Sequence, residues 1–173
     1  MLRRRVAFAI VAGVLVQASV AGGGPHLAVA GPRAGSDCGS KVPAEAQRVF
    51  DDLVTAYRAG SARGIVALME RGKDARILLS LLDVPRATYA SSQALGVLEN
   101  TYFKRHTVTS LTETKDCPKG EGASFARSYL LTTRNDSTET SESLAVRVHR
   151  IDVDRTTSYW VLESIESTLI PKK

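Results

Sequence analysis

The sequence contains little of what metal, nucleophile or phosphate chemistry requires. Among 173 residues it has two cysteines, three histidines and one tryptophan, and aromatic residues make up 6%. The short ligand spacings Cys-x-x-Cys and His-Glu-x-x-His do not occur, which argues against a metal site built on such a motif. Neither a Gly-x-Ser-x-Gly elbow nor a Walker phosphate loop occurs. The sequence therefore predicts no metal centre and no cofactor, and it identifies no reaction.

The N-terminus has the three parts of a secretory signal peptide. Residues 3–5 are arginines, residues 6–16 are a mostly apolar run, and residues 18–21 read Ala-Ser-Val-Ala, a small-residue cleavage site. The apolar run is shorter than the roughly 20 residues that a membrane-spanning helix needs. We expect residues 1–21 to be a signal peptide, with an alternative end at residue 30, and the protein to be exported to the periplasm or the extracellular space without a membrane span.

Cleavage changes the charge of the protein. Loss of the three arginines lowers Lys plus Arg from 23 to 20 against 18 Asp plus Glu, so the net charge falls from +5 to +2. A nucleic-acid-binding domain carries a basic patch or stripe, and the remaining sequence has no Lys/Arg run. We therefore expect no nucleic-acid partner.

Cys38 and Cys117 remain after cleavage. An even number of cysteines in an exported protein predicts a disulfide, although two unrelated thiols are the alternative. Such a bridge would close a loop of about 80 residues and stabilise the fold by roughly 4 kcal/mol in the chain-entropy model. A lipidated cysteine is disfavoured because the residues before Cys38 lack the apolar position of a lipobox.

The segment after the signal peptide predicts a linker followed by one domain. Residues 22–42 are rich in Gly, Ala and Pro and show no periodicity, which is typical of a flexible lead-in. The domain is expected to occupy residues 43–173, a length typical of one domain.

Two amphipathic helices are expected at the start of this domain. Apolar residues recur at three- and four-residue spacing from Pro43 to Tyr57, which predicts a helix of about four turns. Gly60 matches a glycine that ends a helix, and Ser61 matches the cap of a second, shorter helix.

The next elements are a strand and a third helix. The apolar run 75–82 fits either a buried strand or a helix, and we favour a strand that stops at 83–85. Ser91 or Ser92 can then cap a helix that continues to Phe103.

The C-terminal part predicts consecutive antiparallel strands separated by turn residues. In one of them Leu144, Val146 and Val148 alternate with Arg147 and His149, which predicts one buried and one solvent-facing side. A polar run before it fits the tip of a long hairpin. The predicted strands are 107–112, 124–132, 144–149 and a last one that begins at 158.

This order of elements resembles the nuclear transport factor 2-like superfamily, and small secreted bacterial proteins of unknown function in it look most similar. Residues 49–61, 89–103 and 159–162 carry the likeness, which covers about residues 44–170. The resemblance implies an α+β fold in which a strongly curved antiparallel sheet wraps around N-terminal helices as a cone-like barrel. It also implies a pocket at the wide end.

The superfamily includes isomerases and dehydratases that use a pocket carboxylate or a His-Asp pair, beside many binding domains without catalysis. Asp83, His106 and Glu163 are the candidate bases here. Each also has a structural explanation: Asp83 as a turn residue, His106 as the end of a helix, and Glu163 as an exposed strand residue.

Five aromatic residues are candidates for the wall of a ligand pocket, although ordinary core packing is the alternative. They are Tyr102, Phe103, Phe125, Tyr129 and Trp160.

Three functions fit these observations. The first is an exported, non-enzymatic domain that binds a small apolar molecule or a protein partner. The second is a pocket enzyme of the isomerase or dehydratase type, and the third is a structural accessory protein of the cell envelope. The sequence favours a protein that is not an enzyme, and it leaves the oligomeric state open, a homodimer included.

Overall fold

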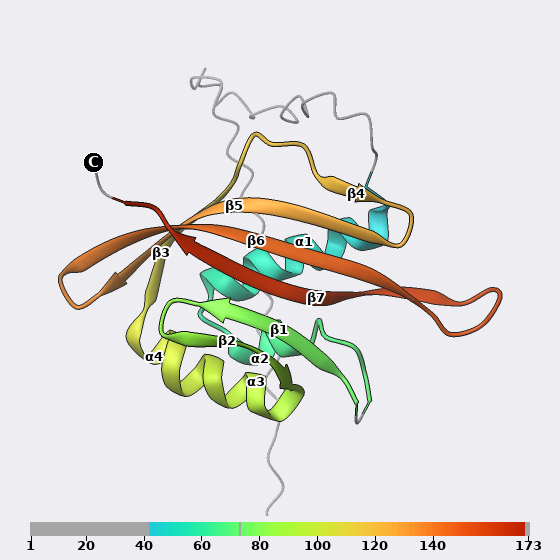
Figure 1. Ribbon diagram of the computed structural model, residues 1–173, viewed down its shortest axis with the longest axis horizontal. Coiled ribbons are helices and arrows are strands. Elements are labelled where there is room, and N and C mark those ends of the chain that lie inside the picture. The colour runs from blue at the N-terminus through green and yellow to red at the C-terminus, as the bar shows by residue number, and fades with distance from the viewer. Residues whose placement is uncertain (1–41, 73, 172–173) are drawn as a thin grey trace, which may run out of the picture. The chain divides into compact units, whose positions relative to one another are not determined.

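The fold is built on a mixed β-sheet with helices packed beside it (Figure 1). The structure, a computed structural model, describes residues 42–72 and 74–171, which belong to one compact unit. The strands are β1 (Arg76–Leu81), β2 (Val84–Ala90), β3 (Thr107–Glu113), β4 (Lys119–Glu121), β5 (Ser124–Asn135), β6 (Thr138–Asp152) and β7 (Ser158–Leu169). Their order across the sheet is β2-β1-β7-β6-β5-β3, and β4 pairs with β5.

Helices precede β1 and link β2 to β3. They are α1 (Ala44–Arg58), α2 (Ala62–Val66), α3 (Ser91–Val97), the π-helical turn η1 (Leu98–Tyr102) and α4 (Phe103–Arg105). Helix α1 packs against β3, β6 and β7, and α3 packs against β1 and β2. Figure 1 shows α1 behind the long strands, so this helix covers one face of the sheet.

Helix α1 forms because its apolar residues repeat every three to four positions after Pro43. Gly60 follows the helix with a φ of 61°, a left-handed conformation that glycine adopts without steric cost. The N–H of Gly64 donates to Oγ of Ser61 at 3.0 Å and caps α2. The predicted first helix, its glycine end and the capped second helix are confirmed. The buried residues of α1 are Ala46, Val49, Phe50, Leu53, Ala56 and Tyr57.

The apolar run 75–82 contains β1, as predicted, but the chain then continues differently from the expectation. Asp83, where the sequence predicts only a stop, adopts a φ of 64° and turns the chain back. Val84 consequently pairs with Leu81, and β2 runs antiparallel to β1. Pro85 is tolerated in β2 because this strand lies at the edge of the sheet.

Strand β1 pairs with β7 in parallel, with Leu78 opposite Ser164 and Ser80 opposite Glu166. The expected antiparallel sheet is therefore wrong: the sheet is mixed. The expected barrel is wrong as well, because β2 and β3 stand at opposite ends of the strand order. Turn residues in a sequence predict only the pairing of strands that a short hairpin loop connects. Strands β1 and β7 lie far apart in the sequence, so no turn residue predicts that they pair.

The third helix begins at Ser91 and is not capped by a serine. Ala90 occupies the cap position, and its N–H donates to Oε1 of Gln93 at 3.1 Å. The predicted serine cap is wrong because the helix already includes Ser91 and Ser92 in its first turn, which leaves Ala90 at the cap position. The helix then widens into η1, where Leu98 and Tyr102 are buried.

The four predicted C-terminal strands are present as β3, β5, β6 and β7, and the short β4 is added to them. Strands β5 and β6 form the long hairpin that the polar run predicts, paired as far as Asn135 and Thr138. Leu144 and Val148 are fully buried, whereas Arg147 between them is exposed. The predicted alternation along β6 is confirmed.

The core lies between the helices and the inward face of the sheet. Within residues 42–72 and 74–171, no helix combines the length and the hydropathy of a membrane span. The signal peptide predicted for residues 1–21, and Cys38, lie outside the described residues. The largest fully buried side chains are Tyr57, Tyr102, Phe50, Leu53, Ile65, Ile77, Leu79, Leu98, Leu131, Leu144, Leu162 and Ile165.

Candidate functional site

Asp83 and His106, two of the candidate bases, lie side by side. Asp83 stands in the turn between β1 and β2, and His106 directly follows α4. Nε2 of His106 is 3.1 Å from Oδ2 of Asp83, and Nη1 of Arg105 is 3.7 Å from the same oxygen. The side chain of His106 is 3% exposed and that of Asp83 is 39% exposed. The pair therefore reaches from the core to the surface.

The contact with Asp83 determines which nitrogen of His106 carries the proton. A carboxylate accepts hydrogen bonds, so Nε2–H donates to Asp83 and Nδ1 is the unprotonated nitrogen of the neutral ring. Nδ1 is buried, and no group among the described residues bonds to it. A carboxylate that holds the imidazole in one tautomer is one part of a general-base arrangement. The other part is a cavity from which a substrate could reach Nδ1, and the groove described below does not supply it, because His106 does not line that groove. The expected structural roles are present too, because His106 ends α4 and Asp83 is a turn residue.

Glu163, the third candidate base, lies beside a different histidine, His149. Its Oε2 is 3.9 Å from Nδ1 of His149, beside a bulge between β6 and β7. The two side chains are 45% and 32% exposed, respectively. Glu163 therefore lies beside His149 in a partly exposed position and does not belong to the Asp83–His106 pair. Among the residues that the structure describes, no three His, Cys, Asp or Glu side chains are grouped so that they could hold a metal ion.

The five aromatic residues expected in a pocket fall into separate groups. Tyr102 and Phe103 pack edge to face, with 5.1 Å between ring centroids. Phe125 and Trp160 pack at 5.6 Å, and Tyr129 is buried. The structure does not bring them together in one pocket wall; Trp160 lines the groove described next.

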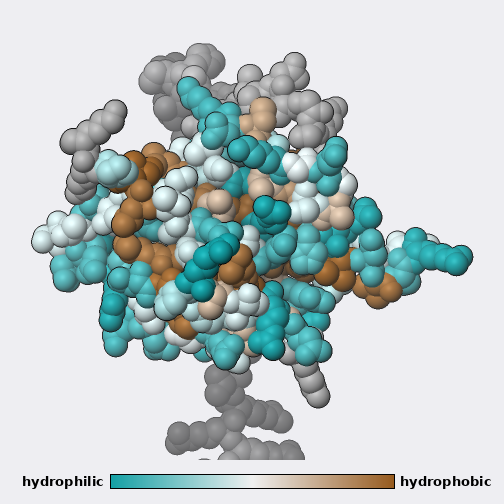
Figure 2. Space-filling view, viewed as in Figure 1, coloured by the Kyte–Doolittle hydropathy of each residue, from teal (hydrophilic) through white to brown (hydrophobic). Residues whose placement is uncertain are grey.

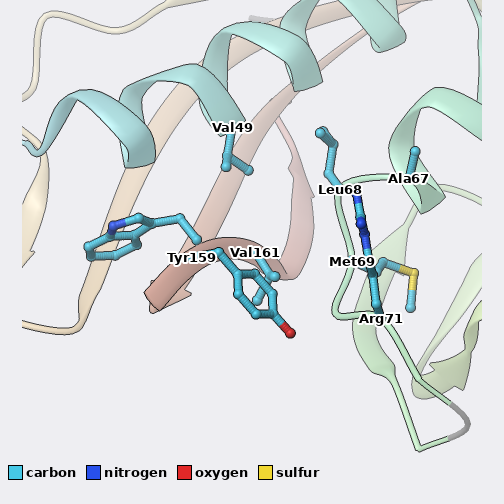
Figure 3. Close-up of a pocket in the computed structure, with 8 residues that line it drawn as sticks. Val49, Ala67, Leu68, Met69, Arg71, Tyr159 and Val161 are labelled. Carbon is cyan, nitrogen blue, oxygen red and sulfur yellow. The ribbon is translucent and has the colours of Figure 1, made fainter. Parts of the chain in front are cut away.

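A groove of about 430 Å³ is lined by α1, the segment after α2 and the start of β7. Figure 3 shows Tyr159 and Val161 on one side of it and Leu68 and Arg71 on the other. The N–H of Leu162 donates to the carbonyl oxygen of Leu68 at 2.8 Å, which holds the segment after α2 against β7. The groove thus has mostly apolar walls on a hydrogen-bonded backbone. Its lining residues are Val49, Ala67, Leu68, Met69, Arg71, Tyr159, Trp160 and Val161.

A second group of polar side chains is enclosed in the core. Glu142 and Thr133 are 0% exposed. Both carboxylate oxygens of Glu142, Oγ1 of Thr133 and the hydroxyls of Tyr57 and Tyr102 are buried without a hydrogen-bond partner among the described residues. Glu142 is not among the predicted site residues, because it lies in the polar run expected at a hairpin tip. The signal that could have found it is its position two residues before Leu144, on the buried face of β6.

The phenols beside Glu142 are held in the neutral form. Burial raises the pKa of Tyr57, and the neighbouring Tyr102 and then Glu142 raise it further. Burial also raises the pKa of Tyr102, with a further contribution from Glu142. Both phenols therefore stay protonated at neutral pH.

Comparison with known proteins identifies the fold. No model of a protein family matches the sequence, and no curated protein matches it. Among solved structures, a DUF4783 family protein from Bacteroides uniformis is 13% identical with a TM-score of 0.54, and the match covers 70% of this chain and 97% of that one. A variant of the protein Rd1NTF2_05 is 12% identical with a TM-score of 0.50, over 71% of this chain and 96% of that one. The chain has the nuclear transport factor 2-like fold.

A putative calcium/calmodulin-dependent protein kinase type II association domain from Thiobacillus denitrificans is 11% identical with a TM-score of 0.55, over 76% of this chain and all of that one. The resemblance predicted from the order of elements is confirmed. Identities this low show the fold alone and transfer no activity.

We predict that the free energy of unfolding falls as the pH rises above about 10, the ordinary pKa of tyrosine. Tyr57, Tyr102 and Tyr129 have a raised pKa in the fold, chiefly through burial. The unfolded chain therefore loses these protons first, so stability is full below pH about 10 and declines as the pH rises toward the folded pKa values. Urea unfolding between pH 8 and 11 measures the slope. Tyr102→Phe should reduce it by up to about 1.4 kcal/mol per pH unit, and an unchanged slope would contradict the prediction.

Proposed function

We propose that this protein binds a small, mostly apolar molecule in the groove between α1 and β7. The observation that carries the proposal is the groove itself, about 430 Å³ in volume with apolar side chains from three segments of the chain. Small-molecule sites are typically concave, mostly apolar and about 300–1,000 Å³ in size. A standard protein interface buries about 800 Å² on each partner, so a groove of this size suits a small molecule better than a protein partner.

The walls of the groove explain how such a molecule would be held. Trp160 offers a large aromatic surface, and Val49 and Met69 add aliphatic and thioether contacts. Apolar area removed from water contributes about 25 cal/mol per Å² before the entropy cost of association. Arg71 and Tyr159 supply polar groups that can orient a ligand.

The pairing of Asp83 with His106 favours acid–base catalysis as a second candidate function. The carboxylate orients the imidazole at 3.1 Å, and Nδ1 faces no protein donor among the described residues. A base of this kind removes a proton next to a carbonyl group, the step that isomerases and dehydratases share. The Glu163 carboxylate, which lies beside His149, has no part in this candidate function.

We also propose that the protein is exported and that Cys38 and Cys117 form a disulfide. The support is the N-terminal pattern of charge, apolar run and small residues, together with the even number of cysteines. Cys117 lies in the segment between β3 and β4. A bridge from there would tie the residues before α1 to the sheet.

We predict that the neutral fluorophore N-phenyl-1-naphthylamine quenches the fluorescence of Trp160, the only tryptophan of the chain and a lining residue of the groove. Leu68→Gln places an amide in the groove wall and should weaken binding about tenfold, because the lost apolar contact is worth about 1–2 kcal/mol. A fluorescence titration measures both effects.

The control for this titration is Leu130→Gln, because Leu130 is an exposed leucine, 44% accessible, on β5. It should bind the fluorophore as the wild type does. Absence of quenching in the wild type, or an equal loss in both variants, would rule out the groove as the binding site.

If the Asp83–His106 pair is catalytic, the protein should accelerate deuterium exchange next to the carbonyl of cyclohexanone, followed by proton NMR in D₂O. Asp83→Asn keeps a residue that tolerates the positive φ of this turn but removes the carboxylate. Exchange should fall by about 10² to 10⁴, whereas Glu163→Gln should leave it unchanged. No acceleration by the wild type over buffer would count against this second function.

Export and the disulfide predict the mass of the secreted protein. The intact mass should lack residues 1–21 or 1–30 and should be about 2 Da below that of the dithiol form, because one disulfide removes two hydrogens. Thiol labelling of the unfolded protein gives an independent count. A retained N-terminus or two labelled thiols would disprove the respective proposal.

A further inference from the structure

The groove between α1 and β7 has one charged side chain among its described lining residues, Arg71. Other arginines of the fold, such as Arg86 and Arg127, pair with carboxylates. Arg71 forms no ion pair within residues 42–72 and 74–171, and neither Asp nor Glu is among the described residues that line the groove. Its positive charge is therefore available to a ligand.

The backbone that carries Arg71 is held in place. The carbonyl oxygen of Leu68 accepts a hydrogen bond from the N–H of Leu162 at 2.8 Å, and Met69, two residues before Arg71, is only 3% exposed. The N–H of Met69 donates to the carbonyl oxygen of Val66 at 3.2 Å, so the turn after α2 is closed by its own hydrogen bond. Arg71 thus extends from an ordered wall, which lowers the entropy cost of placing its guanidinium against a ligand.

Tyr159 adds a hydroxyl group to the same groove. Figure 3 shows the phenol of Tyr159 pointing toward the side on which Met69 and Arg71 lie. A phenol can donate a hydrogen bond to an anion. Trp160, in the apolar part of the wall, packs against Phe125 with 5.6 Å between ring centroids. The groove therefore offers one cation and one hydroxyl donor beside an apolar wall, which suits an amphipathic anion.

The open face of the sheet is less suited to such a ligand. Figure 2 shows the face that looks away from α1, where hydrophobic side chains are spread among hydrophilic ones. Leu130, which is 44% exposed there, has the polar Thr112 and Ser143 as its strand partners. An apolar chain finds a continuous apolar wall in the groove rather than on that face.

We propose, building on the function proposed for the groove, that its ligand is a monocarboxylate with an apolar chain. The planar guanidinium of Arg71 matches the two oxygens of a carboxylate. One arginine balances one negative charge, whereas a phosphate monoester carries about −1.5 to −2 and would stay partly unpaired. The chain packs against Val49, Met69 and Trp160. An ammonium in the place of the carboxylate would face a like charge.

Displacement of N-phenyl-1-naphthylamine from the purified protein at pH 7 tests the proposal, with octanoate, octan-1-ol and octylammonium as competitors. The three compounds share one chain and differ in the charge of the head group. Octanoate should displace the fluorophore at a lower concentration than octylammonium. Arg71→Gln should weaken octanoate about fivefold, the effect of one partly solvated ion pair, and should weaken octan-1-ol much less.

Arg134→Gln is the matched control, because it makes the same change of charge at an exposed arginine beside the β5–β6 turn. It should keep the wild-type affinity for octanoate. Saturation-transfer NMR from the protein to the octyl protons reports binding without the fluorophore.

Three results would overturn this proposal alone, provided that octan-1-ol binds. They are octanoate that binds no better than octylammonium, an equal loss of octanoate and octan-1-ol in Arg71→Gln, and an equal loss of octanoate in Arg71→Gln and Arg134→Gln. If neither the fluorophore nor any octyl compound binds, the function proposed for the groove fails as well.

Discussion

The burial of one face of the sheet under α1 is the constraint on which the rest of the structure depends. Successive residues of a strand point to opposite faces, so every second residue of β5 and β6 must be suited to a core. Phe125, Tyr129 and Leu131 meet this requirement with apolar bulk. The buried side of α1 is apolar as well, so the helix and the sheet are stable only when these two apolar surfaces pack together.

Polar residues on the inward face show how strict this constraint is. Arg127 shares the face with Tyr129, and its side chain is 12% exposed and 2.9 Å from Glu113. Its guanidinium also lies over the ring of Phe50 at 5.0 Å and bonds to Gln47. The protein thus provides partners for this cation. The carboxylate of Glu142 receives none from the described residues.

Local patterns in the sequence predict the elements whose stability is local. The spacing in α1, the Ser61 cap and the alternation of β6 all follow from periodicity and capping chemistry. Two features depend on tertiary contacts: the parallel pairing of β1 with β7 and the π-helical turn η1. No local sequence pattern predicts either of them. Strand β2 is not predictable in the same way, because Asp83 fits a simple stop after β1 as well as the left-handed residue of a tight turn that it is.

The same division applies to the candidate sites. Asp83 and His106 are recognisable as titratable residues, but their contact spans 23 residues and requires the β1–β2 turn to meet the end of α4. Trp160 lines the groove, in agreement with its predicted place in a pocket wall. Tyr102 and Phe103 instead pack against each other. Whether an aromatic residue faces a groove or the core depends on what packs over it, which one sequence does not reveal.

The free edge at β2 has a consequence for self-association. Pro85 has no N–H to offer a neighbouring strand, and the charged Arg86 beside it is held by Glu166 at 3.0 Å. A second copy that tried to extend the sheet across this edge would find a row of donors interrupted at Pro85. Proline and charged residues on an edge strand disfavour pairing with a further strand, so β2 is poorly suited to self-association by continuous strand addition.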